Sequence, residues 1–197
     1  MADIMTRWTI LQQELAPEGP RMVVARQVHG TTVLEQSGGW TGWLRTGQGD
    51  GLVARDRGTA LTVTLADCVP VFIAHPSGVV GLLHSGWRGT AGRIIDVAVA
   101  ALAHAGCPAS EVQVHLGPAI CGRCYEVSAE VREQLTGMPA NRAGHVDLRA
   151  LIAEHGRSAG IQNITVSDFC TRCDNDRFFS HRAGDSGRHV SVIVAAE

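Results

Sequence analysis

A thiol and an imidazole stand at the open end of a predicted β-hairpin. Cys68 precedes the apolar run Val69–Ala74, the turn His75–Gly78 follows, and His84 directly follows the next apolar run. A four-residue loop places Cys68 opposite Ser85, whereas a shift of one residue places it opposite His84. In either register the two side chains start roughly 5–8 Å apart. Such a pair can act as nucleophile and base, or can supply two ligands of a metal ion.

A third residue, His29, extends this pair to a His/Cys/His set. His29 ends the apolar run Met22–Val28 and precedes a turn glycine. Three protein ligands with a fourth position left to water are the arrangement of a catalytic zinc. The alternative is a buried structural cysteine beside a hydrogen-bonded histidine. The predicted pairing and the polar residues around Cys68 and His84 favour the functional interpretation.

Arginines supply the candidate anion-binding groups. A glycine-rich stretch, residues 85–93, leads into a predicted helix, where backbone amides favour anions and where Arg88 and Arg93 can each bind phosphate or carboxylate in a bidentate manner. Farther along, Arg182 follows two phenylalanines and a histidine. That segment is either a pocket wall for an anionic or aromatic substrate, or a loop anchored by its phenylalanines with solvated arginines.

All 17 basic residues are arginine. The absence of lysine excludes a Schiff-base lysine, a Walker-type phosphate-binding loop and a Ser–Lys dyad. The formal net charge of −2 also argues against a nucleic-acid partner.

Two Cys-x-x-Cys pairs, Cys121/Cys124 and Cys170/Cys173, raise the question of a four-thiolate metal site. The pairs are separated by 45 residues, whereas compact zinc modules usually leave about 15–20. The spacing therefore favours free or loosely coupled thiols over a shared metal. Because the N-terminus has no secretory signal pattern, reduced, ligating or catalytic thiols are expected rather than disulfides.

The chain of 197 residues is expected to form one domain with its own core. No apolar run approaches the roughly 18 residues that a membrane span requires. We therefore expect a cytoplasmic protein without a membrane partner. The sequence does not indicate an oligomeric state.

The elements that must position these residues are mostly strands. Apolar, β-branched runs bounded by turn residues predict seven strands: Met22–Val28, Leu61–Leu65, Val69–Ala74, Val79–Leu83, Val112–Leu116, Ile161–Val166 and His189–Val194. Helices are predicted over Thr90–Ala105, with Thr90 as the N-cap, and over Ser128–Leu135 and Asp147–Ala159. The Gly- and Trp-rich stretch Gly38–Gly51 is expected to be an ordered loop. The predicted class is α+β (mixed α/β): a single domain with mixed β-sheets flanked by a few helices.

Five segments, in this order and spacing, resemble the YfiH-like proteins, also called laccase-domain or polyphenol-oxidase-like purine nucleoside phosphorylases. They are Gln27–Gly30, Ala66–Pro70, His84–Thr90, Gly117–Val127 and Phe178–Arg182. The resemblance spans residues 22 to 195. It implies a YfiH-like fold of mixed sheets and a zinc ion held by His29, Cys68 and His84. It also implies phosphorolysis of adenosine, inosine and methylthioadenosine, and deamination of adenosine, with Arg88 and the Gly89–Gly92 turn as candidates for phosphate.

Two departures from the family pattern stand out. Residues 1–197 are expected to form a single YfiH-like domain without the N-terminal segment that family members usually carry. If that segment lines the substrate pocket, the site here is expected to be altered, incomplete or completed by a partner. Ala183 stands where a second arginine often follows the Phe-Phe-Ser-His-Arg run.

Three functions follow from these residues. The first is a zinc-dependent purine nucleoside enzyme with nucleoside and phosphate as its small-molecule partners, with Cys68, His84 and His29 as catalytic and metal-binding residues and with Arg88, Arg93 and Arg182 on the substrate. The second is a metal-free Cys-His hydrolase acting on a peptidoglycan-precursor amide. The third is a non-catalytic metal-binding module. A true laccase is disfavoured because none of the nine histidines forms a His-x-His pair, although thiolate and imidazole ligands can hold copper as well as zinc.

Overall fold

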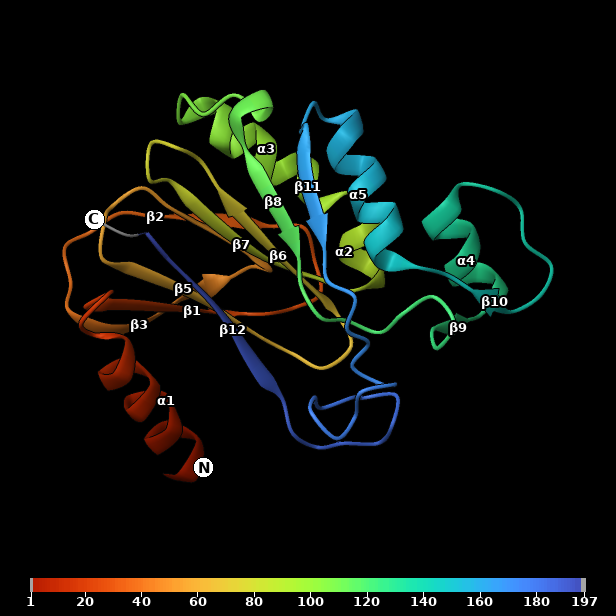
Figure 1. The fold of residues 1–197 in the computed structure, drawn as a ribbon, viewed down its shortest axis with the longest axis horizontal. Coiled ribbons are helices and arrows are strands. Elements are labelled where there is room, and N and C mark those ends of the chain that lie inside the picture. The colour runs from red at the N-terminus through yellow and green to blue at the C-terminus, as the bar shows by residue number, and fades with distance from the viewer. Residues whose placement is uncertain (1, 196–197) are drawn as a thin grey trace.

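Two mixed β-sheets and a helical layer form the fold, shown in Figure 1. The structure is a computed structural model that describes residues 2–195. The four-stranded sheet has the order β12 (His189–Ala195), β5 (Thr59–Leu65), β1 (Arg21–Arg26) and β3 (Gly42–Gln48). The six-stranded sheet has the order β11 (Asn163–Val166), β8 (Gln113–Leu116), β6 (Val69–Ala74), β7 (Val80–Ser85), β4 (Gly51–Ala54) and β2 (Val33–Gln36). Both sheets combine parallel and antiparallel pairs, which confirms the predicted mixed α/β class.

Helices α3 and α5 cover the outer face of the six-stranded sheet, and α1 lies beside the four-stranded sheet (Figure 1). The helices are α1 (Ala2–Leu15), α2 (Trp87–Ala91), α3 (Ile94–His104), α4 (Ala129–Thr136) and α5 (Leu148–Ser158), with a 3-10 turn η1 at Ala109–Glu111. A small ribbon pairs β9 (Glu126–Val127) with β10 (Gly144–His145). Within residues 2–195, no helix is both long and apolar enough to cross a membrane.

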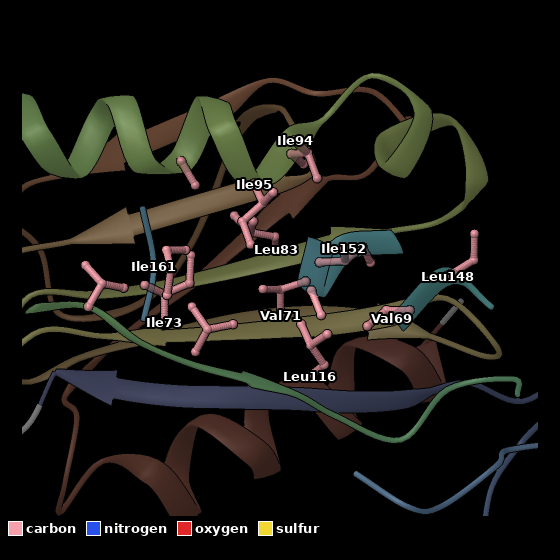
Figure 2. Packing of buried hydrophobic residues seen from close by; sticks show 14 of the residues in the cluster. Val69, Val71, Ile73, Leu83, Ile94, Ile95, Leu116, Leu148, Ile152 and Ile161 are labelled. Carbon is pink, nitrogen blue, oxygen red and sulfur yellow. The ribbon is translucent and has the colours of Figure 1, made fainter. Parts of the chain in front are cut away.

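The six-stranded sheet is buried on both faces, which explains its nearly continuous apolar strands. Along β7, Leu82 packs toward the four-stranded sheet, whereas Leu83 packs toward the helices. Figure 2 shows the helix-side core, where Val71 and Ile73 of β6 pack with Ile95 of α3. This core fixes the carboxyl end of β7 and the amino end of β6, where the candidate residues lie.

Several element predictions are confirmed. Each of the seven predicted strands overlaps an observed strand: β1, β5, β6, β7, β8, β11 and β12. Ser128 Oγ accepts the Val131 N–H at the start of α4, and Asp147 Oδ1 accepts the Arg149 N–H at the start of α5. These two N-caps place the helix starts where the sequence predicts them.

The prediction of one helix over Thr90–Ala105 is wrong, because the helix is broken. Thr90 is not an N-cap but lies inside α2, where its Oγ1 is 3.0 Å from Ser85 Oγ. The chain then turns through Gly92 and Arg93, and Arg93 takes the left-handed conformation at φ 57° before α3 begins. A Cβ at Gly92 would lie 2.6 Å from Thr31, so a residue without a side chain is needed at this break.

The predicted loop over Gly38–Gly51 is also corrected, since β3 forms within it and pairs in parallel with β1. Helix α1 and strands β2 and β4 are further elements that the apolar runs did not predict.

Candidate active site

The structure brings His29, Cys68 and His84 together. Their ligand atoms all lie within 4.8 Å of one another. The two imidazole rings meet edge to face, with centroids 4.8 Å apart and an interplanar angle of 81°. His29 follows β1 of the four-stranded sheet, whereas Cys68 immediately precedes β6 and His84 lies in β7 of the six-stranded sheet. The site therefore joins the two sheets at one end of the fold.

The predicted hairpin register is wrong, although the contact it predicted exists. Ala74 pairs with Val80, so the connection has one residue more than expected. Val69 lies opposite Ser85 and Pro70 opposite His84, so Cys68 takes neither of the two predicted positions. Cys68 lies beyond the end of the ladder, beside Gly86: a Cβ at Gly86 would come within 2.9 Å of its Sγ. The thiol reaches His84 from the turn before β6, not across the strands.

Asp50 organises two of the three residues, and the sequence analysis missed it. Its buried carboxylate accepts the backbone N–H groups of Val28 (3.1 Å), His29 (2.9 Å) and Gly30 (2.7 Å). It also lies 2.8 Å from His84 Nδ1. The three backbone hydrogen bonds hold His29 in the left-handed conformation at φ 60°. The sequence carried no signal for this role, because β4, the buried strand that follows Asp50, was itself not predicted and the burial of the carboxylate is visible only in the structure.

The bond to Asp50 fixes which nitrogen of His84 is available to a ligand. Burial would raise the pKa of Asp50, but its hydrogen bonds with His84 and with the backbone of Gly30 and Val28 lower that pKa below its ordinary value. The ionised carboxylate can only accept, so Nδ1 carries a proton and Nε2 is left for Cys68 or a metal.

Cys68 and His84 stabilise each other's charged form. Burial raises the pKa of the Cys68 thiol, but hydrogen bonds from His29 and His84 outweigh it and lower the pKa to about 7. Burial lowers the pKa of His84, but Asp50 and Cys68 raise it to about 9. Without a metal, His84 is therefore protonated near neutral pH, and the Cys68 thiol loses its proton as the pH rises through about 7.

Asp67, next to Cys68, is the second residue that the sequence analysis missed. It is buried and adopts φ 82°, which turns the chain sharply into β6. Its carboxylate accepts the Thr171 Oγ1–H at 2.6 Å and the Arg182 backbone N–H at 2.7 Å, and its carbonyl accepts the Ile120 N–H at 3.0 Å. The loop between β8 and β9 and the loop between β11 and β12 thus hold the turn that carries Cys68.

Two adjoining cavities flank the three candidate ligands. One, of about 290 Å³, is lined by His29, Ala66, Asp67, Cys68, Gly86, Trp87, Arg88, Ile120, Tyr125, Leu148, His181 and Arg182. The other, of about 400 Å³, is lined by Gln27, His29, Thr64, Leu65, Ala66, Cys68, His84, His181 and Arg188. His29, Ala66, Cys68 and His181 are common to both cavities, so a molecule in either one reaches the thiol.

Only two of the three predicted anion-binding arginines line a cavity at the site. Arg88 and Arg182 line the smaller cavity. Arg93 instead pairs with Asp96 at 2.6 Å, at the junction of α2 and α3. The guanidinium of Arg88 stacks 4.3 Å from the Trp87 ring, and that of Arg182 lies 5.0 Å from the Tyr125 ring.

The two Cys-x-x-Cys pairs also meet. The ligand atoms of Cys121, Cys124, Cys170 and Cys173 all lie within 4.8 Å of one another. Their separation along the chain, which argued against a shared site, is overcome because the two loops run side by side and form a bridge between Ala119 and Cys170.

Comparisons with known proteins give a consistent result. The family described as multi-copper polyphenol oxidoreductase laccase matches residues 1–196. A relative from Streptomyces griseus named purine nucleoside phosphorylase ORF3 is 33% identical over 189 residues, which are 92% of this chain and 77% of the relative. A relative from an unknown prokaryotic organism, named adenosine deaminase RL5, is 38% identical over 160 residues, which are 73% of this chain and 61% of the relative.

Solved structures show the same fold. YlmD from Geobacillus stearothermophilus superposes with a TM-score of 0.85 at 30% identity, covering 100% of this chain and 81% of that protein. The hypothetical protein YfiH from Bacillus licheniformis superposes with a TM-score of 0.86 at 27% identity, covering 97% and 80%. These similarities confirm the predicted YfiH-like fold.

Proposed function

Because the chain belongs to the family of multi-copper polyphenol oxidoreductase laccases, we propose that it is a zinc-dependent enzyme that acts on purine nucleosides, by phosphorolysis and by deamination of adenosine. The observation that carries the proposal is the position of His29, Cys68 and His84, which lie where an arginine-lined cavity meets a larger one. Relatives named purine nucleoside phosphorylase and adenosine deaminase support the substrate class.

The residues present fit a zinc ion. One thiolate and two imidazoles are ligands that zinc prefers, and three protein ligands leave one position open. His84 is already oriented by the Asp50 carboxylate, which is the usual support of a metal-binding histidine. When bound, zinc supplies a Lewis acid that acidifies water and stabilises developing negative charge. The same donor set can hold copper.

Arg88 and Arg182 are proposed to bind phosphate in the smaller cavity. Neither forms a salt bridge with another residue in the range 2–195. Each guanidinium stacks near an aromatic ring, Trp87 or Tyr125, which holds its plane while its edge N–H donors stay available. Arg182 uses one donor on the Glu126 carbonyl at 2.9 Å, which fixes it further.

The nucleoside is proposed to occupy the larger cavity, whose volume lies within the range of about 300–1,000 Å³ typical of small-molecule sites. In phosphorolysis a phosphate oxygen forms a bond to C1′ of the sugar while the bond from C1′ to the base nitrogen breaks. The bonding electron pair leaves with the purine, which takes up a proton. His181 lines both cavities and is the proposed donor of that proton. In deamination a water molecule adds to C6 of adenine and ammonia leaves.

The test uses zinc-loaded protein with adenosine or inosine, with and without phosphate, followed by chromatography of the products. Phosphorolysis gives free base only when phosphate is present, whereas deamination gives inosine from adenosine without phosphate. Arg88→Gln is expected to raise the KM for phosphate, while Arg93→Gln, the matched control, leaves it unchanged. Absence of both products from the folded, zinc-loaded protein refutes the proposal.

A second candidate function is suggested by the chain of contacts Asp50–His84–Cys68. A carboxylate, an imidazole and a thiol in this order are the parts of a cysteine hydrolase, and a peptidoglycan-precursor amide is the substrate to try. Rapid alkylation of Cys68 in protein that contains no metal at this site supports it. Nucleoside binding without turnover points to a non-catalytic metal-binding module.

A further inference from the structure

Four free thiols form a second cluster outside the active site. Cys121 and Cys124 lie between β8 and β9, and Cys170 and Cys173 lie between β11 and β12. All four sulfur atoms lie within 4.8 Å of one another, and those of Cys124 and Cys173 are 3.4 Å apart.

The spacing of the sulfur atoms fits a tetrahedral zinc ion. With zinc–sulfur bonds of about 2.3 Å, a tetrahedron places its sulfur atoms about 3.8 Å apart. Shifts of about an ångström or less bring the observed cluster to that geometry. The backbone supports thiolates here, because Cys170 Sγ accepts the N–H groups of Cys121 at 3.3 Å and of Cys173 at 3.4 Å.

Charge also fits a bound cation. Four thiolates with one Zn²⁺ carry a net charge of −2. Each Cys-x-x-Cys pair contains an arginine at its third position, Arg123 and Arg172, which offsets that charge. Arg172 also donates to the Cys124 carbonyl at 3.3 Å and so links the two loops directly.

We propose that Cys121, Cys124, Cys170 and Cys173 bind a second, structural zinc ion that joins the two loops forming one wall of the active site. Four protein ligands leave no open position for substrate, which is the mark of a structural site. The proposal does not depend on the reaction at His29, Cys68 and His84, because its test counts metal ions.

This site acts on the active site through Asp67. Thr171, next to Cys170, donates to the Asp67 carboxylate, and Ile120, next to Cys121, donates to the Asp67 carbonyl. The turn that presents Cys68 is therefore held by one residue from each metal-binding loop. The loop that holds Cys170 and Cys173 also carries His181 and Arg182 into the substrate cavity.

The test is the zinc content of purified, reduced protein, measured per chain by elemental analysis. Wild type is expected to contain two zinc ions, Cys68→Ala one, Cys173→Ser one, and the double variant none. Cys173 is chosen because it is exposed, so serine does not disturb the core, whereas Cys170 is buried. Cys107→Ala, a cysteine outside both clusters, serves as the control and keeps two ions.

A spectroscopic arm identifies the ligands. Cobalt-loaded Cys68→Ala is expected to show the strong sulfur-to-cobalt charge transfer of a four-thiolate site, and Cys173→Ser in that background is expected to lose it. Hydrogen exchange of residues 167–182 is expected to speed up in Cys173→Ser. The proposal is overturned if folded Cys68→Ala contains no zinc, or if the intact mass of protein purified without reductant shows a disulfide between the two loops in place of the metal.

Discussion

Replacing Asp50 by asparagine is expected to weaken zinc binding at the active site while keeping the shape of the side chain. The carboxylate now accepts three backbone N–H groups and the Nδ1–H of His84. An asparagine has a single side-chain oxygen, which can accept the backbone N–H groups of Val28 and Gly30. Its NH₂ group then faces the His29 N–H and His84 Nδ1.

This arrangement has two consequences that set the size of the effect. The His29 N–H loses its acceptor, which costs about 1–3 kcal/mol of folding free energy. His84 must accept at Nδ1, so its proton moves to Nε2, the nitrogen that faces the metal. Loss of a supporting carboxylate of this kind lowers metal affinity by roughly 10- to 100-fold, equivalent to roughly 1.4–2.8 kcal/mol.

The assay is competition for zinc with a chelator of known affinity, carried out in the Cys173→Ser background so that one site is measured. Asp56→Asn is the matched control, because Asp56 also accepts a backbone N–H, that of Gly38, but lies beyond the end of β4 opposite to Asp50. The proposed role of Asp50 is refuted if folded Asp50→Asn binds zinc as tightly as the parent. It is also refuted if Asp56→Asn weakens zinc binding to the same extent.

Three further predictions follow from packing and charge. Gly86→Ala places a Cβ 2.9 Å from Cys68 Sγ and is expected to lower the zinc content; Gly47→Ala, whose Cβ would make only an ordinary contact with Leu34, is the control. Leu83→Ala is expected to cost about 2–5 kcal/mol in urea unfolding, because Leu83 of β7 is fully buried in the core on the helix side of the six-stranded sheet; an unchanged midpoint contradicts the assigned core. Burial lowers the pKa of His189, so its contribution to stability is present above the unfolded pKa of about 6.5 and is lost as pH falls below it. His189→Gln is therefore expected to flatten the decline in unfolding temperature between about pH 7 and pH 5, and an equally steep decline contradicts this.

The strands were predictable where burial on both faces made the chain continuously apolar, as in Val69–Ala74. Gly42–Gln48 was not, because Gly42, Gly47 and the polar residues between them interrupt the apolar pattern, and the segment becomes a strand by pairing with β1. The break between α2 and α3 was also hidden, since the apolar spacing of a helix continues across Gly92 and Arg93. Local sequence patterns therefore predicted the core strands. They did not predict β3, which depends on pairing with β1, or the break between α2 and α3, which depends on a close contact at Gly92.

The three candidate ligands could be identified because each stands at the end of an apolar run beside polar residues. The residues that orient them could not. Asp50 and Asp67 act through hydrogen bonds to segments between 20 and 115 residues away, and no local spacing reveals such partners. The same limitation applies to the four-cysteine cluster, whose two halves are joined only by the folded loops.

The active site also bears on the order of events in folding. Its three ligands come from separate segments, at positions 29, 68 and 84, and from two different sheets. An unfolded chain would have to close long loops before it could offer this set, and non-local contacts of this kind form slowly. The zinc ion proposed for this site is therefore expected to bind only after both sheets are paired, and then to stabilise the native state by mass action. The rate of metal uptake during refolding consequently reports the docking of one sheet on the other.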